Sequence, residues 1–140
     1  MNKMKIGWKH SLTILVFAIF GILAVGTGGS NSDSTNSAET AFSLSAGELY
    51  KEYNANEVAA DAKYKGKTGE VTGTIRTVGK DILDQMYVEL GVSYLEGVQC
   101  TFVKDQAENV AKLVKGQKIK VKGVVKRKLV NVLMDECILL

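Results

Sequence analysis

The sequence predicts a mainly β domain with helices: a five-stranded Greek-key barrel with an added N-terminal helix and a helix between strands 3 and 4. A helical pattern at the start of the body changes near residue 68 to strands of alternating polarity. A short helical pattern interrupts those strands once, and glycines lie inside two of them. With 140 residues, of which 46% are hydrophobic and 24% charged, the chain is expected to hold one folded domain.

Residues 1–26 have the pattern of an export signal. Three lysines precede an uncharged apolar segment over residues 11–26, and this order is typical of a signal peptide. Small residues at 24–26 allow cleavage, whereas an uncleaved segment 11–26 would be a membrane anchor of less than the usual length. A buried core helix is the alternative, although segment 11–26 has no polar face.

Residues 27–41 are rich in Gly, Ser, Thr and Asn and contain almost nothing apolar. Such a composition cannot bury surface, so this segment is expected to be a flexible tether. The folded domain is then expected over residues 42–140. Together these segments predict an exported protein that is either anchored facing away from the cytoplasm or secreted after cleavage.

One helix is predicted over residues 45–64. Ser45 and Glu48 have the spacing of a capping box, and Gly66 follows as a C-terminal cap. Apolar residues between them recur at spacings of four and seven, as on one face of a helix. These residues are Leu49, Tyr53, Ala60 and Tyr64.

Alternating polarity predicts the strands that follow. The strands are expected over residues 68–78, 85–90, 98–103, 118–126 and 129–140. A second helix is expected over 105–114, where Asp105 is a plausible cap and Gly116 a stop. Five strands with a helix between the third and fourth are the plan of the OB-fold, and Gly73 and Gly123 lie where such a barrel must bend.

Seven segments carry a resemblance to a known family. They are ELY (48–50), YNANE (53–57), ADAKYKGK (60–67), VTGTI (71–75), GVQCTF (97–102), LVKGQ (113–117) and DEC (135–137). In this order they resemble the bacterial tRNA-anti-like family. The resemblance covers about residues 44–139 and implies an OB-fold domain of a kind that is often exported, frequently as a lipoprotein. No cysteine stands directly after the apolar segment here, so lipid attachment at a lipobox is not expected, and the resemblance transfers no catalytic residue.

The charge distribution gives no support for a body that binds nucleic acid generally. The chain has 18 Lys and Arg against 15 Asp and Glu, a net charge of +3. Lys3, Lys5 and Lys9 account for this excess, because basic and acidic residues balance from residue 31 onward. The basicity therefore belongs to the N-terminal segment.

The one histidine of the sequence is His10, so the predicted domain has none. This excludes Ser-His-Asp and Cys-His catalysis and histidine metal sites there, and we expect no enzymatic activity, metal or cofactor. Asp81 with Asp84, and Asp135 with Glu136, are compatible with an acid/base or divalent-ion site. We favour a solvated turn and a strand edge, since no loop has the spacing of a ligand set.

Cys100 and Cys137 are expected on the third and fifth strands, which are neighbours in an OB barrel. An exported domain lies in an oxidising compartment, so we predict a disulfide between them. Such a bond would contribute about 3–4 kcal/mol in the chain-entropy model. Two buried free thiols are the alternative, and the spacing does not indicate a redox-active motif.

Residues 112–128 include eight basic residues and no acidic one. The lysines of the fourth strand are expected to project from one face, and the run 126–128 is expected in the loop before the last strand. That loop borders the ligand face of OB-folds, where tyrosines would offer stacking surfaces. The candidate binding residues are Lys118, Lys120, Lys122, Lys126, Arg127, Lys128, Tyr87 and Tyr94. A solvated face or a protected strand edge, an anionic polymer or lipid, and a protein partner are the three interpretations.

These observations predict an exported or membrane-tethered OB-fold binding domain of the cell envelope. Its partner is expected to be a protein or another envelope component, with the membrane itself contacted through residues 11–26 if these are uncleaved. The alternative is a single-stranded nucleic-acid-binding protein that uses the basic segment 112–128. Nucleic acid is not the favoured partner, because the domain has zero net charge and tRNA is not found outside the membrane.

Overall fold

Residues 38–140 are described by a computed structural model. The predicted signal or anchor at 1–26 and most of the predicted tether at 27–41 lie outside the described residues. No helix within residues 38–140 is long and apolar enough to cross a membrane. The described residues belong to one compact unit with its own hydrophobic core.

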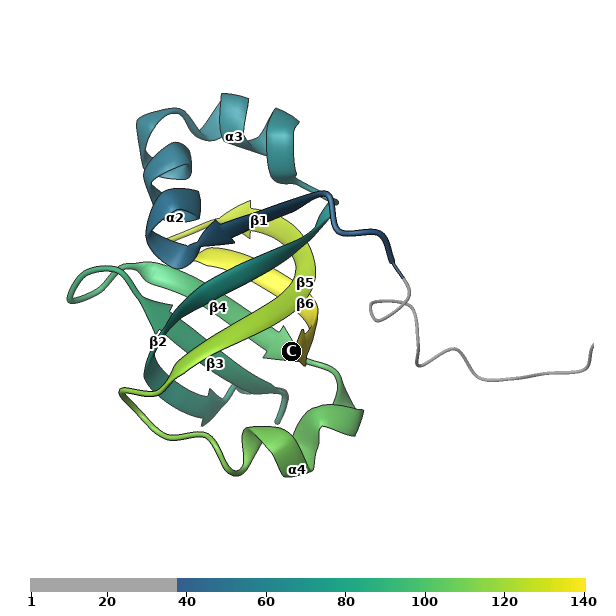
Figure 1. Cartoon of the computed structure of the whole chain (residues 1–140). Coiled ribbons are helices and arrows are strands. Elements are labelled where there is room, and N and C mark those ends of the chain that lie inside the picture. Colours follow the sequence, from purple (N-terminus) through teal and green to yellow (C-terminus); the bar gives the residue numbers. More distant parts are fainter. Residues whose placement is uncertain (1–37) are drawn as a thin grey trace, which may run out of the picture. The chain divides into compact units, whose positions relative to one another are not determined.

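The described strands form one mixed sheet that closes into a barrel (Figure 1). Their order is β1-β2-β3-β4-β6-β5, and a further pairing of β2 with β5 closes the sheet. The strands are β1 (Phe42–Ser45), β2 (Thr68–Lys80), β3 (Met86–Gly91), β4 (Gly97–Phe102), β5 (Lys118–Lys128) and β6 (Val132–Leu139). β4 and β6 run parallel, as the third and fifth strands of an OB-fold do. The predicted five-stranded barrel is therefore confirmed in β2 to β6.

β1 is an additional strand that the sequence did not predict. It pairs in parallel with the start of β2, with Phe42 opposite Gly69 and Ser45 opposite Thr72. Its four residues lie directly before the helix cap at Ser45, so they are too few to show a clear alternation of polarity. Pairing with a strand more than twenty residues later, rather than any local pattern, defines this element.

Two glycines allow the barrel to close tightly, as predicted from their places inside strands. A Cβ atom on Gly73 would lie 2.9 Å from the Cβ of Leu90 and 3.1 Å from that of Ala46. A Cβ atom on Gly123 would lie 2.5 Å from the Sγ of Cys137. A side chain at either position would therefore force the neighbouring strand or helix apart.

The predicted helix over 45–64 is two helices, α2 (Ala46–Ala55) and α3 (Glu57–Tyr64). Asn56 between them has an extended backbone, and its side-chain oxygen accepts a hydrogen bond from Ala59 N (3.1 Å), which caps α3. The predicted capping box of α2 is confirmed, because Glu48 N donates to Ser45 Oγ (3.2 Å) and Ser45 N donates to Glu48 Oε2 (2.8 Å). A helical spacing of apolar residues continued across the break, which is why the pattern indicated one helix.

The helix between β4 and β5 is shorter than predicted. A 3-10 turn, η1 (Lys104–Gln106), leads into the single turn of α4 (Ala107–Val110). Val110 is buried whereas Val114 is 63% exposed, so the apolar face ends after one turn. The chain beyond it pairs with β2 instead, where Ile75 N donates to Gln117 O and Gly116 N donates to Ile75 O (both 2.8 Å).

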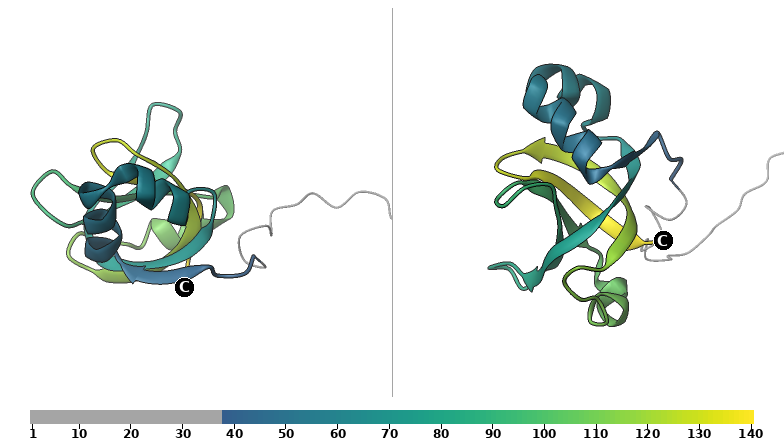
Figure 2. Two further views of the ribbon diagram at one scale, coloured as in Figure 1. Left: turned by 90° about the horizontal axis from the view of Figure 1, so that it is seen from above. Right: turned by 60° about the vertical axis from the view of Figure 1, so that its left-hand side comes forward.

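The helices cover the two ends of the barrel. α2 and α3 pack over one end and α4 lies at the opposite end (Figures 1 and 2). The predicted helix face is buried, with Leu49, Tyr53, Ala60 and Tyr64 each at most 3% exposed. With both ends covered, the side wall of the barrel and its loops are left to make contacts.

Candidate binding face

Cross-strand pairing places a row of side chains on the outside of β3, β4, β6 and β5. Partners in register share one face of a sheet, so residues opposite one another here point the same way. This row consists of Glu89, Gln99, Leu133 and Arg127, and the pair Tyr87 and Thr101 lies beside it. All six are partly or fully exposed, and we call them the outer face.

Three loops project around the outer face (Figure 2). They are the β2–β3 loop (81–85), the β3–β4 loop (92–96) and the β5–β6 loop (129–131). Each carries two adjacent apolar side chains that are strongly exposed, and Val92 of the β3–β4 loop is exposed as well. The pairs are Ile82 with Leu83, Tyr94 with Leu95, and Leu129 with Val130. The outer face is therefore a polar surface with apolar groups at its rim.

Arg76 and Glu89 hold two of these loops. The Arg76 guanidinium lies 3.2 Å from the Glu89 carboxylate, and both side chains are about one-fifth exposed (21% and 19%). Arg76 Nη1 also donates to three carbonyl oxygens of the β3–β4 loop, those of Ser93 (3.0 Å), Tyr94 (3.3 Å) and Glu96 (3.1 Å). Glu89 Oε1 accepts from Asn131 Nδ2 of the β5–β6 loop (3.2 Å). The sequence indicated no role for Arg76, because every one of these partners is distant along the chain.

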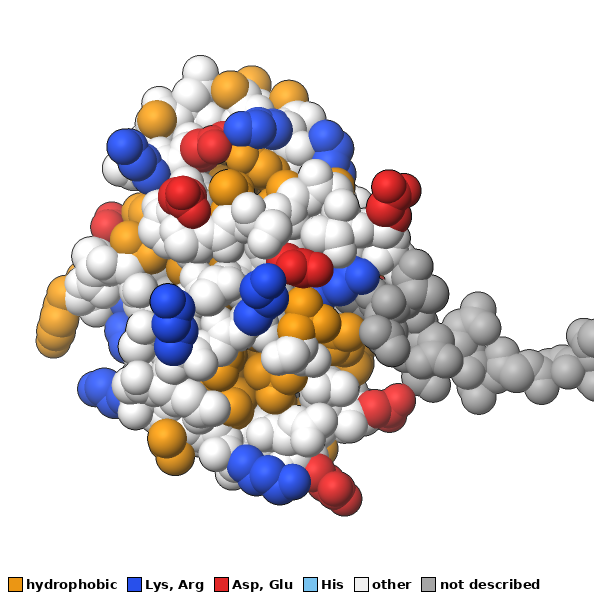
Figure 3. Space-filling view, in the orientation of Figure 1, with side chains coloured by type: hydrophobic (Ala, Val, Ile, Leu, Met, Phe, Trp, Pro, Cys, Tyr) orange, Lys and Arg blue, Asp and Glu red, His pale blue; other side chains and the backbone are white. Residues whose placement is uncertain are grey.

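The lysines of β5 lie on another side of the barrel. Lys118 and Lys120 are exposed, and they face Thr74 and Thr72 of β2 rather than the outer face. Lys120 Nζ forms an ion pair with Glu70 (3.2 Å). In the view of Figure 3, the basic side chains are separated from one another by acidic and uncharged groups instead of forming one patch.

Lys122 does not project into solvent as predicted, since it is only 9% exposed. It lies between Glu70 of β2 and Ile138 of β6 in register, and these flanking strands cover its aliphatic stem. The alternation was read correctly, but the surrounding strands decide how much of the side chain reaches water.

The run Lys126-Arg127-Lys128 lies at the end of β5 and not in the following loop, which was the expectation. Pairing with β6 continues to Lys128, opposite Val132, and a register shift between Val125 and Arg127 interrupts the alternation that marked the strand in sequence. Lys126 and Arg127 are exposed, and Lys128 Nζ lies 5.5 Å from the ring centre of Tyr50 in α2. The run nevertheless borders the β5–β6 loop.

The two candidate tyrosines lie on the same side of the barrel as this run. Tyr87 belongs to the outer face and packs over Gly79, where a Cβ atom would lie 3.0 Å from the tyrosine Oη. Tyr94 is 91% exposed at the tip of its loop. Of the eight candidate residues, Tyr87 and Arg127 therefore share the outer face and Tyr94 lies on a loop at its rim, whereas Lys128 is opposite the buried Val132 and contacts Tyr50.

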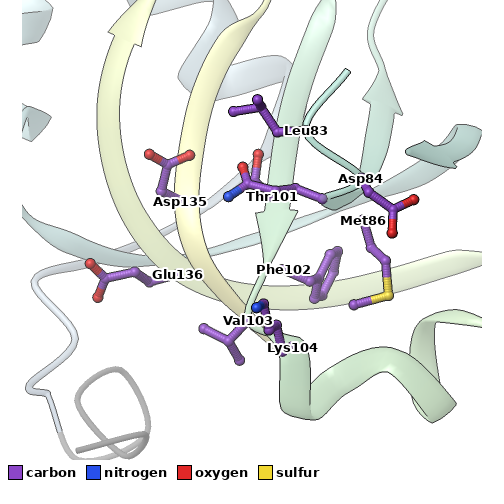
Figure 4. A pocket seen from close by; sticks show the side chains of 10 residues that line it. Leu83, Asp84, Met86, Thr101, Phe102, Val103, Lys104, Asp135 and Glu136 are labelled. Carbon is purple, nitrogen blue, oxygen red and sulfur yellow. The ribbon is translucent and has the colours of Figure 1, made fainter. Parts of the chain in front are cut away.

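A groove of about 590 Å³ opens beside the outer face, between the β2–β3 loop, β4 and β6 (Figure 4). Asp84, Asp135 and Glu136 line it, together with Lys104 and the apolar side chains of Met86 and Phe102. Asp84 and Glu136 have left-handed backbones (φ 62° and 55°), and Asp84 forms an ion pair with Lys80 (2.9 Å). Within residues 38–140, no three His, Cys, Asp or Glu side chains lie close enough together to hold a metal ion. The groove is acidic, which is unfavourable for a phosphate backbone.

Asp81 does not join the other acids in this groove. Its Oδ1 accepts hydrogen bonds from Leu83 N (2.8 Å) and Gln85 N (2.9 Å), so the side chain holds the β2–β3 turn. This geometry agrees with the interpretation of Asp81 as a turn residue.

Cys100 and Cys137 lie on the neighbouring strands β4 and β6, as predicted, and both are buried free thiols in the structure. Burial, with a smaller contribution from Cys100, raises the pKa of the Cys137 thiol well above its usual value. The pairing of β4 with β6 contains a register shift, because Cys100 lies opposite Met134 whereas Phe102 lies opposite Cys137. A disulfide between the two remains a prediction.

The strands β2 to β6 form a closed barrel in which the third and fifth strands pair in parallel and a helix precedes the fourth. This arrangement defines an OB-fold domain. The family model of tRNA_anti-like domains matches residues 4–138, and the chain belongs to this family. A comparison with curated proteins finds no match.

Among the solved structures that are similar to the chain, one has a TM-score of 0.59 and 17% sequence identity. It is a Klebsiella pneumoniae protein described as a candidate nucleic acid-binding lipoprotein, and the match covers 80% of this chain and 99% of that one. At this identity the similarity shows the fold alone.

Proposed function

We propose that the chain is a non-catalytic binding domain of the bacterial cell envelope, exported and either tethered to the membrane or released, whose partner is a protein that docks on the outer face. The observation that carries this proposal is the outer face itself, with Tyr87 and Arg127 surrounded by apolar pairs on three loops. Tyrosine and arginine are enriched in protein interfaces, and apolar groups beside them exclude water.

The chemistry of the described residues supports binding rather than catalysis. Residues 38–140 contain no histidine, and within them no three Cys, Asp or Glu side chains lie close enough together to hold a metal ion. The outer face offers a phenol, an amide and a hydroxyl, from Tyr87, Gln99 and Thr101, as hydrogen-bonding groups for a partner. The predicted signal at residues 1–26 supports the envelope location.

Single-stranded nucleic acid is the alternative partner. It is favoured by the description of the structural relative and by the location of Arg127 and Tyr87 on one face. The acidic groove, Glu89 within the face, and the division of the lysines between two sides of the barrel are unfavourable for it. We therefore expect no binding of single-stranded oligonucleotides at low salt. A salt-sensitive complex that is lost on charge reversal of Lys126, Arg127 and Lys128 would instead establish the alternative.

Photo-crosslinking in the native host tests the proposal. A photoreactive phenylalanine analogue at Tyr87 would lie on the outer face, and the same group at Val58, which is 82% exposed on α3, is the matched control. We expect a discrete protein adduct in the envelope fraction from position 87 and none from position 58. Equal labelling from both positions, or a protein confined to the cytoplasmic fraction, would contradict the proposal.

A further inference from the structure

Two loop tips on one side of the barrel form an apolar patch. Loops 92–96 and 129–131 lie side by side in both views of Figure 2. Their most exposed apolar side chains are Tyr94 (91%), Leu95 (66%), Leu129 (59%) and Val130 (62%), which we call the tip patch. Four large apolar groups gathered on projecting loops indicate a contact surface.

The tip patch is held in place from beneath. Arg76 donates to the carbonyl oxygens of the first loop, and Glu89 accepts from Asn131 of the second. Within the loops, Val92 N donates to Glu96 O (2.9 Å) and Leu129 N to Asn131 O (2.9 Å). Because these hydrogen bonds already order the loops, binding through the tip patch would cost little conformational entropy.

The net charge beside the tip patch is positive, with Lys126, Arg127 and Lys128 against Glu96. Lys126 and Arg127 are exposed immediately before the second loop, and Lys128 lies against Tyr50. Glu96, the acid of the first loop, accepts a hydrogen bond from Ser93 Oγ (3.0 Å). Projecting apolar tips next to cations are complementary to a partner that has anionic groups on its surface and an apolar layer beneath them.

We propose that the tip patch docks the domain onto an anionic lipid bilayer. Tyr94, Leu95, Leu129 and Val130 enter the headgroup region, and Lys126 and Arg127 contact lipid phosphates. Tyrosine is favoured at this depth because its ring is apolar and its hydroxyl polar. Projecting tips fit a flat bilayer, and this contact goes beyond the proposed protein partner, although Arg127 and the apolar pairs of these two loops also border the outer face on which that partner docks.

Vesicle binding tests this proposal. Residues 38–140 hold the closed sheet and the buried core, so this segment is used; it lacks the apolar residues 11–26, which would enter lipid themselves. We expect it to sediment with vesicles of phosphatidylcholine and phosphatidylglycerol but not with phosphatidylcholine alone. Near 1 M salt, where the screening length falls to about 3 Å, we expect binding to weaken strongly.

Matched variants locate the contact. We expect Leu95→Ser with Val130→Ser, and Lys126→Glu with Arg127→Glu, each to weaken vesicle binding by about tenfold or more. The apolar control is Ile82→Ser with Leu83→Ser in the β2–β3 loop, and the charge control is Lys112→Glu with Lys115→Glu beyond α4; both controls should bind normally. Absent vesicle binding, equal losses in the controls, or displacement of the vesicles by a tightly bound oligonucleotide would overturn the proposal.

A second measurement uses the full chain and does not depend on the isolated segment. Trp8 is the one tryptophan of the sequence, so Trp8→Phe leaves a background in which Leu95→Trp reports on the tip patch. With vesicles of brominated anionic lipids, we expect the tryptophan fluorescence of Leu95→Trp to be quenched. The fluorescence of Leu83→Trp in the same background should not be quenched. Equal quenching would overturn lipid docking, whereas the crosslink from position 87 tests the protein partner independently.

Discussion

The Arg76 guanidinium lies 3.2 Å from the Glu89 carboxylate, and this one ion pair joins the two loops that carry the tip patch. Arg76 reaches the carbonyls of loop 92–96, while Glu89 reaches Asn131 of loop 129–131. Because both charged groups are mostly covered, each depends on the other for compensation of its charge.

We expect Arg76→Met to lower the free energy of unfolding by about 1–3 kcal/mol, because the mostly buried Glu89 loses its cation and four loop carbonyls lose a donor. Urea unfolding measures this loss. Arg76→Lys, which keeps the charge but not the forked donor, should be intermediate. A variant as stable as the natural protein would show that water replaces these contacts without cost.

We expect Gly123→Ala to destabilise the reduced protein by about 1–3 kcal/mol, because its new Cβ would meet Cys137 Sγ at 2.5 Å. Cys137→Ala removes that sulfur, so the second Gly123→Ala substitution should cost less in this background. A double-mutant cycle by urea unfolding under reducing conditions measures the coupling. Additive losses would mean that the backbone oxygen of Asp135, at 3.0 Å, is the real obstacle.

In protein purified from its native host, we expect Cys100 and Cys137 to take up an alkylating agent only after reduction and unfolding. Intact mass with and without reductant reports both this bond and cleavage of the signal. Denatured samples are needed, because burial and the raised pKa of Cys137 would also protect free thiols in the folded domain. Alkylation of both residues after unfolding without reductant would exclude the disulfide and weaken the export hypothesis.

We expect the domain to lose stability at alkaline pH. Burial, followed by the hydrogen bond that Tyr53 Oη donates to Asp61 (3.1 Å), raises the pKa of Tyr53 in the folded state. Its contribution is therefore complete below the unfolded-state pKa of about 10 and declines as the pH rises above it. Urea unfolding of Tyr53→Phe should show a shallower decline above about pH 10. An unchanged profile would assign the decline to other groups, such as the Cys137 thiol.

Local patterns were sufficient for much of this fold. The alternation in β2 to β6 follows from side chains pointing to opposite faces of a strand, and the Ser45–Glu48 capping box is complete within one turn. The plan of the OB-fold correctly predicted that Cys100 and Cys137 lie on neighbouring strands. These features depend on residues close in sequence or on a topology with few alternatives.

Only the tertiary structure decided the features that depend on long-range register. β1 exists because β2 is available to pair with it, and the bulge near Val125 extends β5 through Lys128. Lys122 is covered by strands on both sides, and Arg76 acts on loops that follow it by 17 residues or more. The sequence determined by itself the order of the five barrel strands and the cap of the first helix, whereas the closure of the barrel determined where several elements begin and end and which side chains face a partner, because a side chain's neighbours across a sheet are set by register.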